Sequence, residues 1–327
     1  MAKILLTTPP EVSDEILAPD LRTRLESLGE VDQLEGRQLP DDFADTWDVL
    51  VTGWETPCVP AVSGTTLRLI AHSAGTMRGI IDPDLIASGQ IAVSQAGSDP
   101  MARAVAEHAL ASTLVMLREL HTYDRGMQST RDWATSRQPA LSTAIHTQRH
   151  GLIGLSRTGQ WHARMLKGLG VREVVAFDPY FPPDAARELG VELVSLSDAM
   201  SNPVVAVHAP VTEETRRMIG PGQLDLMPEG GLFVNTARSA VICMDALEQR
   251  LVQGRLRAAL DVFEEEPLPS DYVLFGLPNV MLTPHVAGST VDARHEMGEA
   301  VVDEVERFLN GQPLQFQVDP ARAHQLS

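Results

Sequence analysis

The sequence predicts an α/β protein made of two doubly wound, parallel-sheet domains with a cleft between them. Short apolar runs alternate with amphipathic helical patterns over most of the chain, and this alternation occurs in two consecutive series. Strands separated by helices favour parallel pairing through right-handed crossovers. The length of 327 residues also suits two domains of ordinary size better than one.

The composition supports a folded protein and argues against several classes of partner. Hydrophobic residues make up 43% of the chain and charged residues 21%, which allows a sizeable core. The 44 acidic residues outnumber the 26 lysines and arginines, and the formal charge of −18 disfavours binding to nucleic acid or an anionic membrane surface. No apolar run approaches the roughly 20 residues of a membrane span. Cys58 and Cys243 offer neither a disulfide framework nor metal-ligand spacing, so we expect no metal and a reducing, cytoplasmic location.

The first series of strands and helices occupies the N-terminal third of the chain. Its expected strands are Ile4–Leu6, Val49–Val51, Leu67–Ala71 and Ile91–Val93. A long helix is expected over roughly Met101–Leu120, because apolar residues recur there at helical spacing. The polar segment Thr122–Gln148, rich in Arg, Ser, Thr and Gln, is expected to be irregular.

The second series has the same alternating pattern and a helical tail. Its expected strands are His150–Leu155, Val174–Phe177, Val204–His208, Gly231–Asn235, Ala258–Val262 and Val280–Leu282. A final helix is expected over Val291–Leu309, where Asn310-Gly311 forms a stop signal. The terminus Gln312–Ser327 is expected to add little structure of its own.

A tight glycine turn opens the second series, with Gly154 after a strand and Gly159 at the start of a helix. Such a turn presents backbone N–H groups at the positive end of a helix, which suits a pyrophosphate. Gly154 makes the turn and Gly159 lets helix and strand pack closely, but Ser156 replaces the middle glycine of the usual motif. The alternative is an ordinary glycine turn without a nucleotide.

Asp178 supplies the context that a dinucleotide site needs, because it ends the next strand 19 residues after Gly159. An acid there accepts hydrogen bonds from the ribose 2′-hydroxyl of NAD and repels the 2′-phosphate of NADP. Pro179 follows it, with no arginine beside it to bind a phosphate. If the glycine turn is coincidental, the alternative is an Asp that only caps a turn. The combination predicts NAD as the cofactor.

Three polar groups follow strands of the second series. Arg238 lies just past one strand, a carboxylate cluster from Asp261 to Glu266 follows the next, and His285 comes after a third, its approach stiffened by Pro284. Ligands bind at the carboxyl ends of such strands. An arginine can bind an anion, a histidine can move a hydroxyl proton, and a carboxylate can support the imidazolium. This set suits a 2-hydroxy or 2-keto acid.

With these motifs the sequence resembles the D-isomer-specific 2-hydroxyacid dehydrogenases of the formate/phosphoglycerate dehydrogenase type over nearly its whole length. The resemblance is densest in Gly151–Gly159, His208–Pro210, Asn235–Arg238, Gly254–Phe263, Glu266–Pro269 and Leu277–His285. It implies Rossmann-like or flavodoxin-like domains with NAD in the cleft between them. The substrate-binding domain would comprise residues 1–100 and 286–327, and the NAD-binding domain residues 101–285.

The resemblance also implies individual roles. Arg238 matches the residue that binds the carboxylate and polarises the carbonyl of the substrate, His285 the general acid/base, and Glu266 the partner that raises the pKa of this histidine. Asp261 matches a residue near the nicotinamide carboxamide, and Arg157 one that contacts the pyrophosphate. The full cofactor-binding set is Gly154, Ser156, Arg157, Thr158, Gly159, Asp178, Pro179, His208, Ala209, Pro210, Thr215, Thr236, Ala237, Arg238, Asp261, His285 and Gly288.

The substrate-binding set includes residues of the first domain. Ser73, Ala74 and Gly75 align with the loop whose backbone amides hold the substrate carboxylate, and Arg238 completes the set. Trp54, like His72, either lines the substrate pocket or simply packs in the first domain. A homodimer is expected from the family, with contacts from the helix after Met101 and from the segment Thr122–Gln148.

Four departures from the family pattern leave the substrate open. Met101 replaces an asparagine, Ser239 a glycine and Cys243 an aspartate, in addition to Ser156 in the glycine loop. The first of these disfavours a formate dehydrogenase, whereas a short phosphoglycerate dehydrogenase remains an alternative. A second class is a corepressor-like, NAD-sensing protein that binds partners without significant turnover. Such proteins usually carry extra basic or disordered tails, which we do not expect here.

Overall fold

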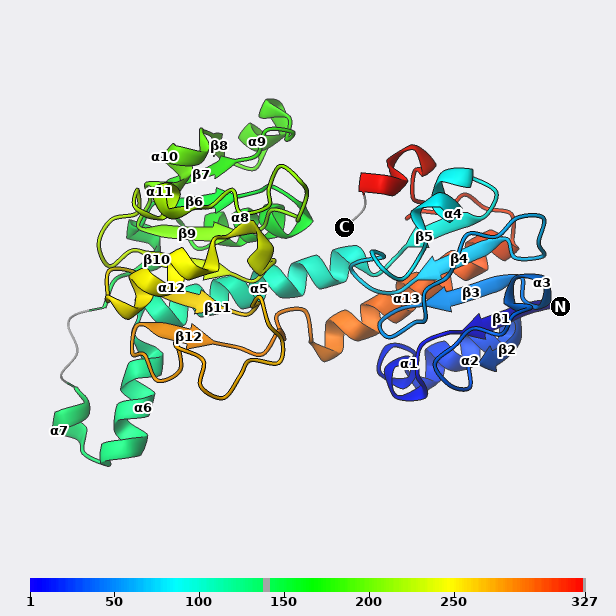
Figure 1. Cartoon of the computed structure of the whole chain (residues 1–327), viewed down its shortest axis with the longest axis horizontal. Coiled ribbons are helices and arrows are strands. Elements are labelled where there is room, and N and C mark those ends of the chain that lie inside the picture. The colour runs from blue at the N-terminus through cyan, green and yellow to red at the C-terminus, as the bar shows by residue number, and fades with distance from the viewer. Residues whose placement is uncertain (138–141, 326–327) are drawn as a thin grey trace. The chain divides into compact units, whose positions relative to one another are not determined.

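The computed structural model describes residues 1–137 and 142–325 (Figure 1). Residues 138–141 of the segment expected to be irregular, and residues 326–327 of the terminus, lie outside the described residues. The chain divides into two compact units, Met1–Ala102 with Ser289–Ser327 (unit 1) and Arg103–Gly288 (unit 2). Each unit is built on its own parallel sheet, which confirms the predicted fold class.

Unit 1 contains a five-stranded sheet in the order β2-β1-β3-β4-β5. Its strands are β1 (Ala2–Leu6), β2 (Gly29–Gln33), β3 (Val49–Thr52), β4 (Leu69–His72) and β5 (Ala92–Gln95). Its helices are α1 (Pro10–Ile16), α2 (Pro19–Leu28), α3 (Phe43–Thr46), α4 (Pro83–Ser88), α13 (Val291–Leu309) and the 3-10 helix η3 (Pro320–Gln325). Strand β2 was not predicted, because the sequence Gly-Glu-Val-Asp-Gln offers one apolar residue and the strand lies at the sheet edge.

The two faces of this sheet bury alternate residues of each strand. Ile4 and Leu6 pack in the cluster that contains the apolar residues of α2 and α13. Leu5, between them, packs in the opposite cluster with Phe43 of α3 and Leu85 of α4. Because successive strand side chains point to opposite faces, a strand covered on both faces reads as a continuous apolar run.

Unit 2 contains a seven-stranded sheet in the order β12-β11-β10-β9-β6-β7-β8. Its strands are β6 (His150–Ile153), β7 (Val174–Phe177), β8 (Glu192–Leu193), β9 (Val204–Val207), β10 (Leu232–Asn235), β11 (Arg257–Leu260) and β12 (Val280–Leu282). Its other helices include α8 (Arg157–Gly168), α9 (Pro183–Glu188), α10 (Leu196–Met200), α11 (Pro221–Leu224), η2 (Ser239–Val241) and α12 (Met244–Val252). Strand β6 therefore lies between β7 and β9, and the order of the strands reverses beside it.

Helices also cover both faces of the unit 2 sheet. Val204 and Ala206 of β9 pack in the cluster that includes Leu166 of α8, whereas Val205 packs in the cluster that includes Leu247 of α12. A doubly wound parallel sheet of this kind binds ligands outside the carboxyl ends of its strands, where the order reverses.

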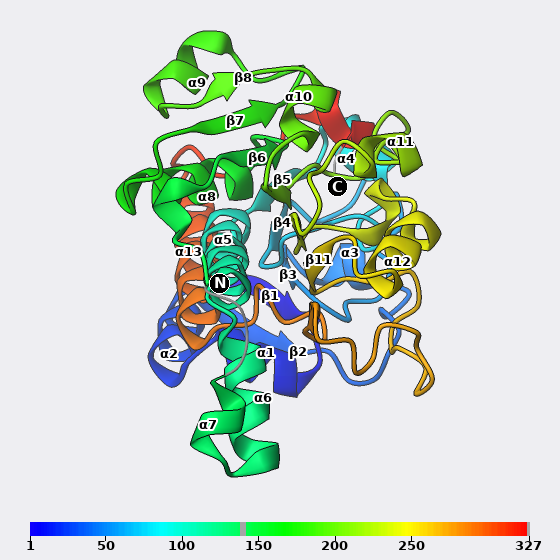
Figure 2. The same cartoon turned by 90° about the vertical axis from the view of Figure 1, so that its left-hand side faces the viewer.

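The segment after the long helix is more regular than predicted. The long helix α5 begins at Ser98 and ends at Leu117, and it is followed by α6 (Leu120–Thr130), α7 (Trp133–Ser136) and the 3-10 helix η1 (Ile145–Thr147). The prediction of an irregular segment rested on its polar composition and overlooked Leu120, Tyr123 and Met127, which recur at helical spacing although α6 buries none of its residues. In both views α6 and α7 extend away from the sheet of unit 2 (Figures 1 and 2). No helix in the described ranges is long and apolar enough to cross a membrane.

The C-terminal segment contributes more to unit 1 than predicted. Gln317 forms a bridge with Ser94 of β5, and Val318 is buried. The fully buried carboxylate of Glu304 accepts hydrogen bonds from the backbone N–H groups of Gln315 and Phe316, at 2.8 and 3.0 Å. The prediction was wrong because Val318 and Ala323 pack in the core and because a buried acid in α13 binds the backbone of the segment.

Candidate active site in unit 2

Every predicted site residue of the second series lies in a segment that follows the carboxyl end of a strand in unit 2. The segments follow β6, β7, β9, β10, β11 and β12. These six strands are neighbours in the sheet, in the spatial order β12-β11-β10-β9-β6-β7. They contain Gly154, Ser156, Arg157, Thr158 and Gly159 after β6, Asp178 and Pro179 after β7, His208, Ala209, Pro210 and Thr215 after β9, Thr236, Ala237 and Arg238 after β10, Asp261 and Glu266 after β11, and His285 and Gly288 after β12. The topology thus collects them at one edge of one sheet.

The glycine turn between β6 and α8 has the backbone that the sequence motif requires. Gly154 has a φ of +99°, a conformation that side chains with a Cβ rarely adopt. At Gly159 an added Cβ would lie 2.2 Å from the carbonyl oxygen of Gly154, so only glycine lets the helix approach the turn this closely. The first N–H groups of α8 have no partners within the helix, which suits an anion.

Ser156, which departs from the motif, has a structural partner. Its hydroxyl donates a hydrogen bond of 2.9 Å to the carbonyl oxygen of His208. The bond joins the segment after β6 to the segment after β9, across the point where the strand order reverses. The serine therefore ties the turn to the neighbouring strand with its side chain directed at protein backbone.

The carboxylate of Asp178 is oriented by backbone amides at the end of β7. Its Oδ2 accepts a hydrogen bond of 2.7 Å from the N–H of Leu155, and its Oδ1 accepts bonds of 3.0 and 3.1 Å from the N–H groups of Tyr180 and Phe181. The side chain therefore caps its own turn, as one sequence-based alternative stated. It also lies against the glycine turn, as the other alternative required.

Two buried polar atoms at this edge have no hydrogen-bond partner within the described part of the chain. They are Oγ1 of Thr236 and Nδ1 of His208, and both residues are at most 5% exposed. Buried polar groups are normally satisfied, so such atoms indicate a group that the protein alone does not supply. The glycine turn, the oriented acid and these unpaired atoms fit a dinucleotide.

The histidine and the glutamate of the predicted acid–base pair are in direct contact. Nδ1 of His285 lies 2.7 Å from Oε2 of Glu266, and Oε1 of Glu266 accepts a hydrogen bond of 2.9 Å from the N–H of Phe263. Partial burial alone would raise the pKa of Glu266. The hydrogen bonds from His285 and Phe263, together with the positive charges of His285 and Arg238, outweigh this and hold the pKa of the carboxyl below its ordinary value.

The backbone of His285 is strained, and an anchored acid holds the loop that carries it. His285 has a φ of +54°, which is uncommon for any residue other than glycine and is often found at functional sites. Asp261, which is 1% exposed, accepts hydrogen bonds from the N–H groups of Val286 and Ala287 and from the hydroxyl of Thr283, at 3.0, 2.9 and 2.6 Å. The carboxylate thereby fixes the loop on both sides of the histidine.

Arg238 follows β10 and is exposed, and its charge acts on Glu266. The backbone around it is set by Asn235, whose side-chain oxygen accepts from the N–H of Ala237 and whose amide donates to the carbonyl of Arg238. Ser239, which replaces a family glycine, donates a hydrogen bond of 2.8 Å to the carbonyl of Phe263. The structure therefore brings Arg238, Glu266 and His285 together.

The predicted substrate residues other than Arg238 belong to unit 1. Trp54 follows β3, and Ser73, Ala74 and Gly75 follow the adjacent strand β4. The two loops touch, because a Cβ added to Gly53 would lie 2.5 Å from Oγ of Ser73. The Arg294 guanidinium of α13 lies 4.2 Å from the ring centroid of Trp54, a contact that sequence reasoning missed because the two residues are far apart in the chain.

His72 packs in unit 1. Its ring is fully buried, and its two nitrogens lie 2.9 Å from the hydroxyl of Thr52 and 2.8 Å from the carbonyl of Thr76. Burial lowers its pKa to about 4, and the hydrogen bond to Thr76 only partly opposes this. Since both nitrogens are occupied, the packing alternative describes His72 better than a role in a pocket.

Sequence reasoning also missed a buried histidine pair beneath the glycine turn. Nδ1 of His162, one helical turn after Gly159, lies 2.8 Å from Nε2 of His208, and both rings are buried. Burial first, and then the neighbouring charges of His208 and His150, lower the pKa of His162 well below its ordinary value. The available signal was a polar residue at an inward position of α8.

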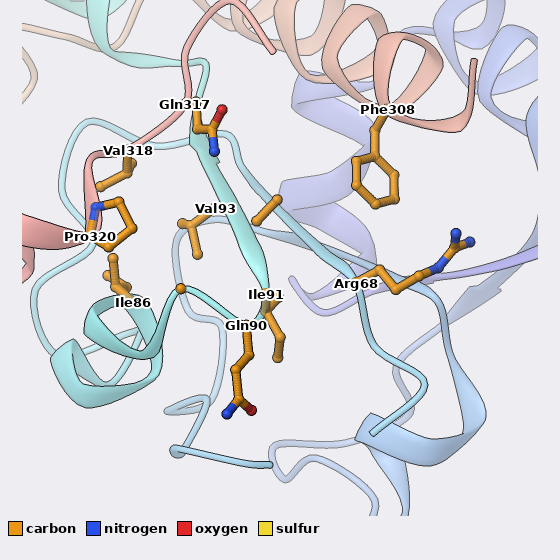
Figure 3. Close-up of a pocket in the computed structure, with 11 residues that line it drawn as sticks. Arg68, Ile86, Gln90, Ile91, Val93, Phe308, Gln317, Val318 and Pro320 are labelled. Carbon is orange, nitrogen blue, oxygen red and sulfur yellow. The ribbon is translucent and has the colours of Figure 1, made fainter. Parts of the chain in front are cut away.

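A cavity of about 300 Å³ lies in unit 1 (Figure 3). Its wall includes Arg68 and Gln90, which come just before β4 and β5, and Val318 and Pro320 of the C-terminal segment. It therefore opens at the amino ends of the strands, whereas Trp54 and Ser73 follow their carboxyl ends. Among the described residues, no group of three or more His, Cys, Asp or Glu side chains is arranged to hold a metal ion.

Comparison with known protein families gives a match over more than half of the chain. Residues 110–287 match the family model described as "D-isomer specific 2-hydroxyacid dehydrogenase, NAD binding domain". The matched region falls within unit 2 and contains the glycine turn, Asp178 and the cluster of Arg238, Glu266 and His285. NAD is accordingly the cofactor of this domain.

Individual relatives extend the similarity. A D-3-phosphoglycerate dehydrogenase of Methanocaldococcus jannaschii is 32% identical over 319 residues, which are 95% of this chain and 58% of that protein. A glyoxylate reductase of Korarchaeum cryptofilum is 35% identical over 211 residues, 63% of each protein. The crystal structure of a phosphoglycerate oxidoreductase from Rhizobium etli shares the fold, with a TM-score of 0.80, 24% identity and coverage of 98% of this chain and 99% of that one. The chain spans about half the length of the first curated relatives it matches.

Proposed function

The chain belongs to the family of D-isomer specific 2-hydroxyacid dehydrogenases, and from this premise we propose that it interconverts a 2-keto acid and a D-2-hydroxy acid with NAD. The observation that carries the proposal is the 2.7 Å contact between His285 and Glu266, beside the charge of Arg238. An acid–base histidine, its carboxylate partner and an anion-binding arginine stand at the same sheet edge as the glycine turn. This is the chemistry that a 2-keto acid needs.

The proposed roles of His285, Glu266 and Arg238 follow from the contacts of their side chains. Nδ1 of His285 faces Glu266, which leaves Nε2 to donate a proton to the carbonyl oxygen in reduction and to accept the hydroxyl proton in oxidation. Glu266 is held at the backbone of Phe263 and orients the ring. Arg238 binds the substrate carboxylate and polarises its carbonyl. NAD, when bound, carries the hydride that the substrate carbon gains or loses.

The proposed cofactor site uses the segments after β6, β7, β9 and β10. The turn from Gly154 to Gly159 and the start of α8 would hold the pyrophosphate, with Arg157 adding positive charge. Asp178 would accept from the ribose hydroxyls, since its oxygens retain lone pairs beyond those used by backbone amides. Thr236 has an unpaired buried hydroxyl with which to meet the cofactor.

The proposed substrate-binding domain is unit 1, and the proposed NAD-binding domain is unit 2. Within unit 1, the backbone amides of Ser73, Ala74 and Gly75 would bind the substrate carboxylate, and Trp54 would contact its side chain. The stacked guanidinium of Arg294 supports the indole ring in one orientation.

We also propose a homodimer in the cytoplasm. Helices α6 and α7 expose Leu120, Met127 and Trp133, with 51%, 39% and 73% of their surface accessible. Apolar side chains on an extension of this kind favour a subunit contact. Both cysteines are free, as expected in a reducing compartment. Light scattering should give about twice the 35.6 kDa of one chain, and a monomer at micromolar concentration would contradict the dimer.

The test is a panel of 2-keto acids assayed with NADH: glyoxylate, hydroxypyruvate, pyruvate, phenylpyruvate and 2-ketoisocaproate. We expect NADH-dependent reduction of at least one of them to the D-2-hydroxy acid, identified by chiral chromatography. Tight NADH binding without turnover of any member of the panel would instead favour a corepressor-like, NAD-sensing role. Formation of the L-isomer would overturn the proposal.

A further inference from the structure

His108, in the third turn of α5, contacts the loop that carries His285. Its Nε2 lies 3.2 Å from the hydroxyl of Thr283 and 3.9 Å from Oδ1 of Asp261. Thr283 in turn lies 2.6 Å from the same carboxylate oxygen. All three residues belong to unit 2, and 23% of the His108 side chain is exposed, so it does not merely fill the core.

The number of available protons fixes the direction of each hydrogen bond. An ionised carboxylate only accepts, so the single hydroxyl proton of Thr283 is donated to Asp261. The oxygen of Thr283 then faces His108 as an acceptor, which requires a proton on Nε2 of His108. The chain of donors therefore runs from His108 through Thr283 to Asp261, and it defines the tautomer of a neutral His108.

This chain of hydrogen bonds acts on the turn that contains His285. The N–H of His285 donates to the carbonyl of Thr283 at 3.1 Å, and the φ of +54° at His285 needs continuous support from its surroundings. Asp261 holds the loop after the histidine through Val286 and Ala287. His108 fixes the side chain of Thr283 before it, so the turn is held from both ends.

We propose that His108 is a positioning residue for the acid–base step, which it supports through Thr283 by holding the turn of His285. The proposal rests on the proposed function. It assigns a role in turnover to a residue of α5 that is not among the predicted site residues. It predicts a defect in turnover rather than in cofactor affinity, because the hydrogen bond of His108 acts on the turn of His285 and not on the glycine turn.

The kinetic test compares two substitutions with a matched control. His108→Met removes the donor at similar size, and His108→Gln restores an N–H at a similar reach. We expect His108→Met to lower kcat about tenfold with the Kd for NADH unchanged, and His108→Gln to recover most of kcat. His121 of α6, whose Nε2 lies 3.0 Å from the carbonyl of Pro278, is the control, and His121→Met should leave kcat unchanged. Equal losses in His108→Met and His108→Gln would overturn the proposal.

A second measurement does not depend on activity. Nitrogen-15 NMR of the histidine rings in the chain without cofactor should show His108 protonated at Nε2. The ring signals of His285 should shift in His108→Met and stay in place in His108→Gln. A proton on Nδ1 of His108, or an unshifted His285 in His108→Met, would overturn the proposal. If the unmutated chain reduces no 2-keto acid, the proposed function fails, and this measurement still decides the role of His108.

Discussion

Unit 1 and unit 2 share one architecture but present different chemistry at the same place. In both, the first strand lies between the second and a later one, so that the strand order reverses beside it. In unit 1, the hydroxyl of Thr7 after β1 donates to the carbonyl of Val51 and lies 3.1 Å from the hydroxyl of Thr56. Buried hydroxyl groups therefore occupy the point where the strand order reverses. In unit 2 the same point holds the glycine turn, with Ser156 bonded to the carbonyl of His208.

The difference continues along the two carboxyl edges. In unit 1, the residue that ends β4 is His72, a buried histidine with both nitrogens occupied. In unit 2, the segments after β10, β11 and β12 supply Arg238, Glu266 and His285 around one another. A doubly wound sheet therefore provides an edge where ligands can bind, and the residues after each strand decide what the edge does.

The largest effect should come from removing the proposed acid–base group of unit 2, His285. His285→Ala should lower kcat by about 10²–10⁴-fold, because the variant loses the side chain proposed to move the proton, while NADH still binds. Steady-state kinetics and fluorescence titration of NADH measure the two quantities. His295→Ala, a partly exposed histidine of α13 in unit 1, is the control and should have no effect. Full activity of His285→Ala would contradict the proposal that the carboxyl edge of the unit 2 sheet carries the acid–base group.

The next largest effect is expected at the glycine turn, where a substitution should weaken NADH binding in unit 2 but not at the matching point of unit 1. Gly159→Ala should weaken NADH binding by about tenfold or more, because the new Cβ would lie 2.2 Å from the carbonyl oxygen of Gly154. Gly168→Ala at the end of the same helix is the matched control, since an added Cβ there meets nothing within 4 Å. Thr56→Val, at the reversal point of unit 1, should leave the NADH affinity unchanged. Equal affinities for all three variants would contradict a nucleotide site at this turn.

Acid should destabilise unit 2 more than unit 1. Burial lowers the pKa values of His150 and His208 to about 4 and holds that of His162 well below its ordinary value, whereas unit 1 has one described histidine of this kind, His72. A lowered histidine pKa means that the stability is complete above the ordinary value of 6.5 and is lost as the pH falls toward about 4. By about pH 5, each such histidine should lower the free energy of unfolding by on the order of 2 kcal/mol.

Hydrogen exchange, measured by mass spectrometry between neutral pH and about pH 5, reports each unit separately. Protection should fall first in the strands of unit 2. In His162→Leu, which removes one titrating group of the buried pair, the loss should begin at lower pH. Equal loss of protection in both units would mean that the buried histidines do not distinguish them.

A smaller effect is expected for cofactor choice. Asp178→Ala should narrow the preference for NADH over NADPH, since the carboxylate that would repel a 2′-phosphate is gone. The ratio of kcat/KM for the two cofactors measures this change. Asp184→Ala, an exposed acid of α9, is the control for the general loss of negative charge. Equal use of NADH and NADPH by the unmutated chain would contradict the assigned role of Asp178.

The sequence predicted most strands and the cluster of Arg238, Glu266 and His285 because both follow from local patterns. Buried parallel strands read as short apolar runs, and functional residues come directly after them. Strand β2 and the two-residue β8 escaped prediction because edge strands need little apolar surface. Contacts such as Arg294 with Trp54, or His162 with His208, depend on how helices pack on the sheet, and no local pattern encodes that placement.

The contact between Glu266 and His285 lies at the centre of the account, and a pH–rate profile of Glu266→Gln tests it most directly. The hydrogen bond and the positive charge of His285 help to lower the pKa of Glu266, so the carboxylate and the imidazolium stabilise each other. Glu266→Gln removes the carboxylate, and the imidazolium should then release its proton more easily. The alkaline fall-off of keto-acid reduction and the acidic fall-off of hydroxy-acid oxidation should therefore both move to lower pH. Profiles of Glu266→Gln that coincide with those of the unmutated chain would contradict the account.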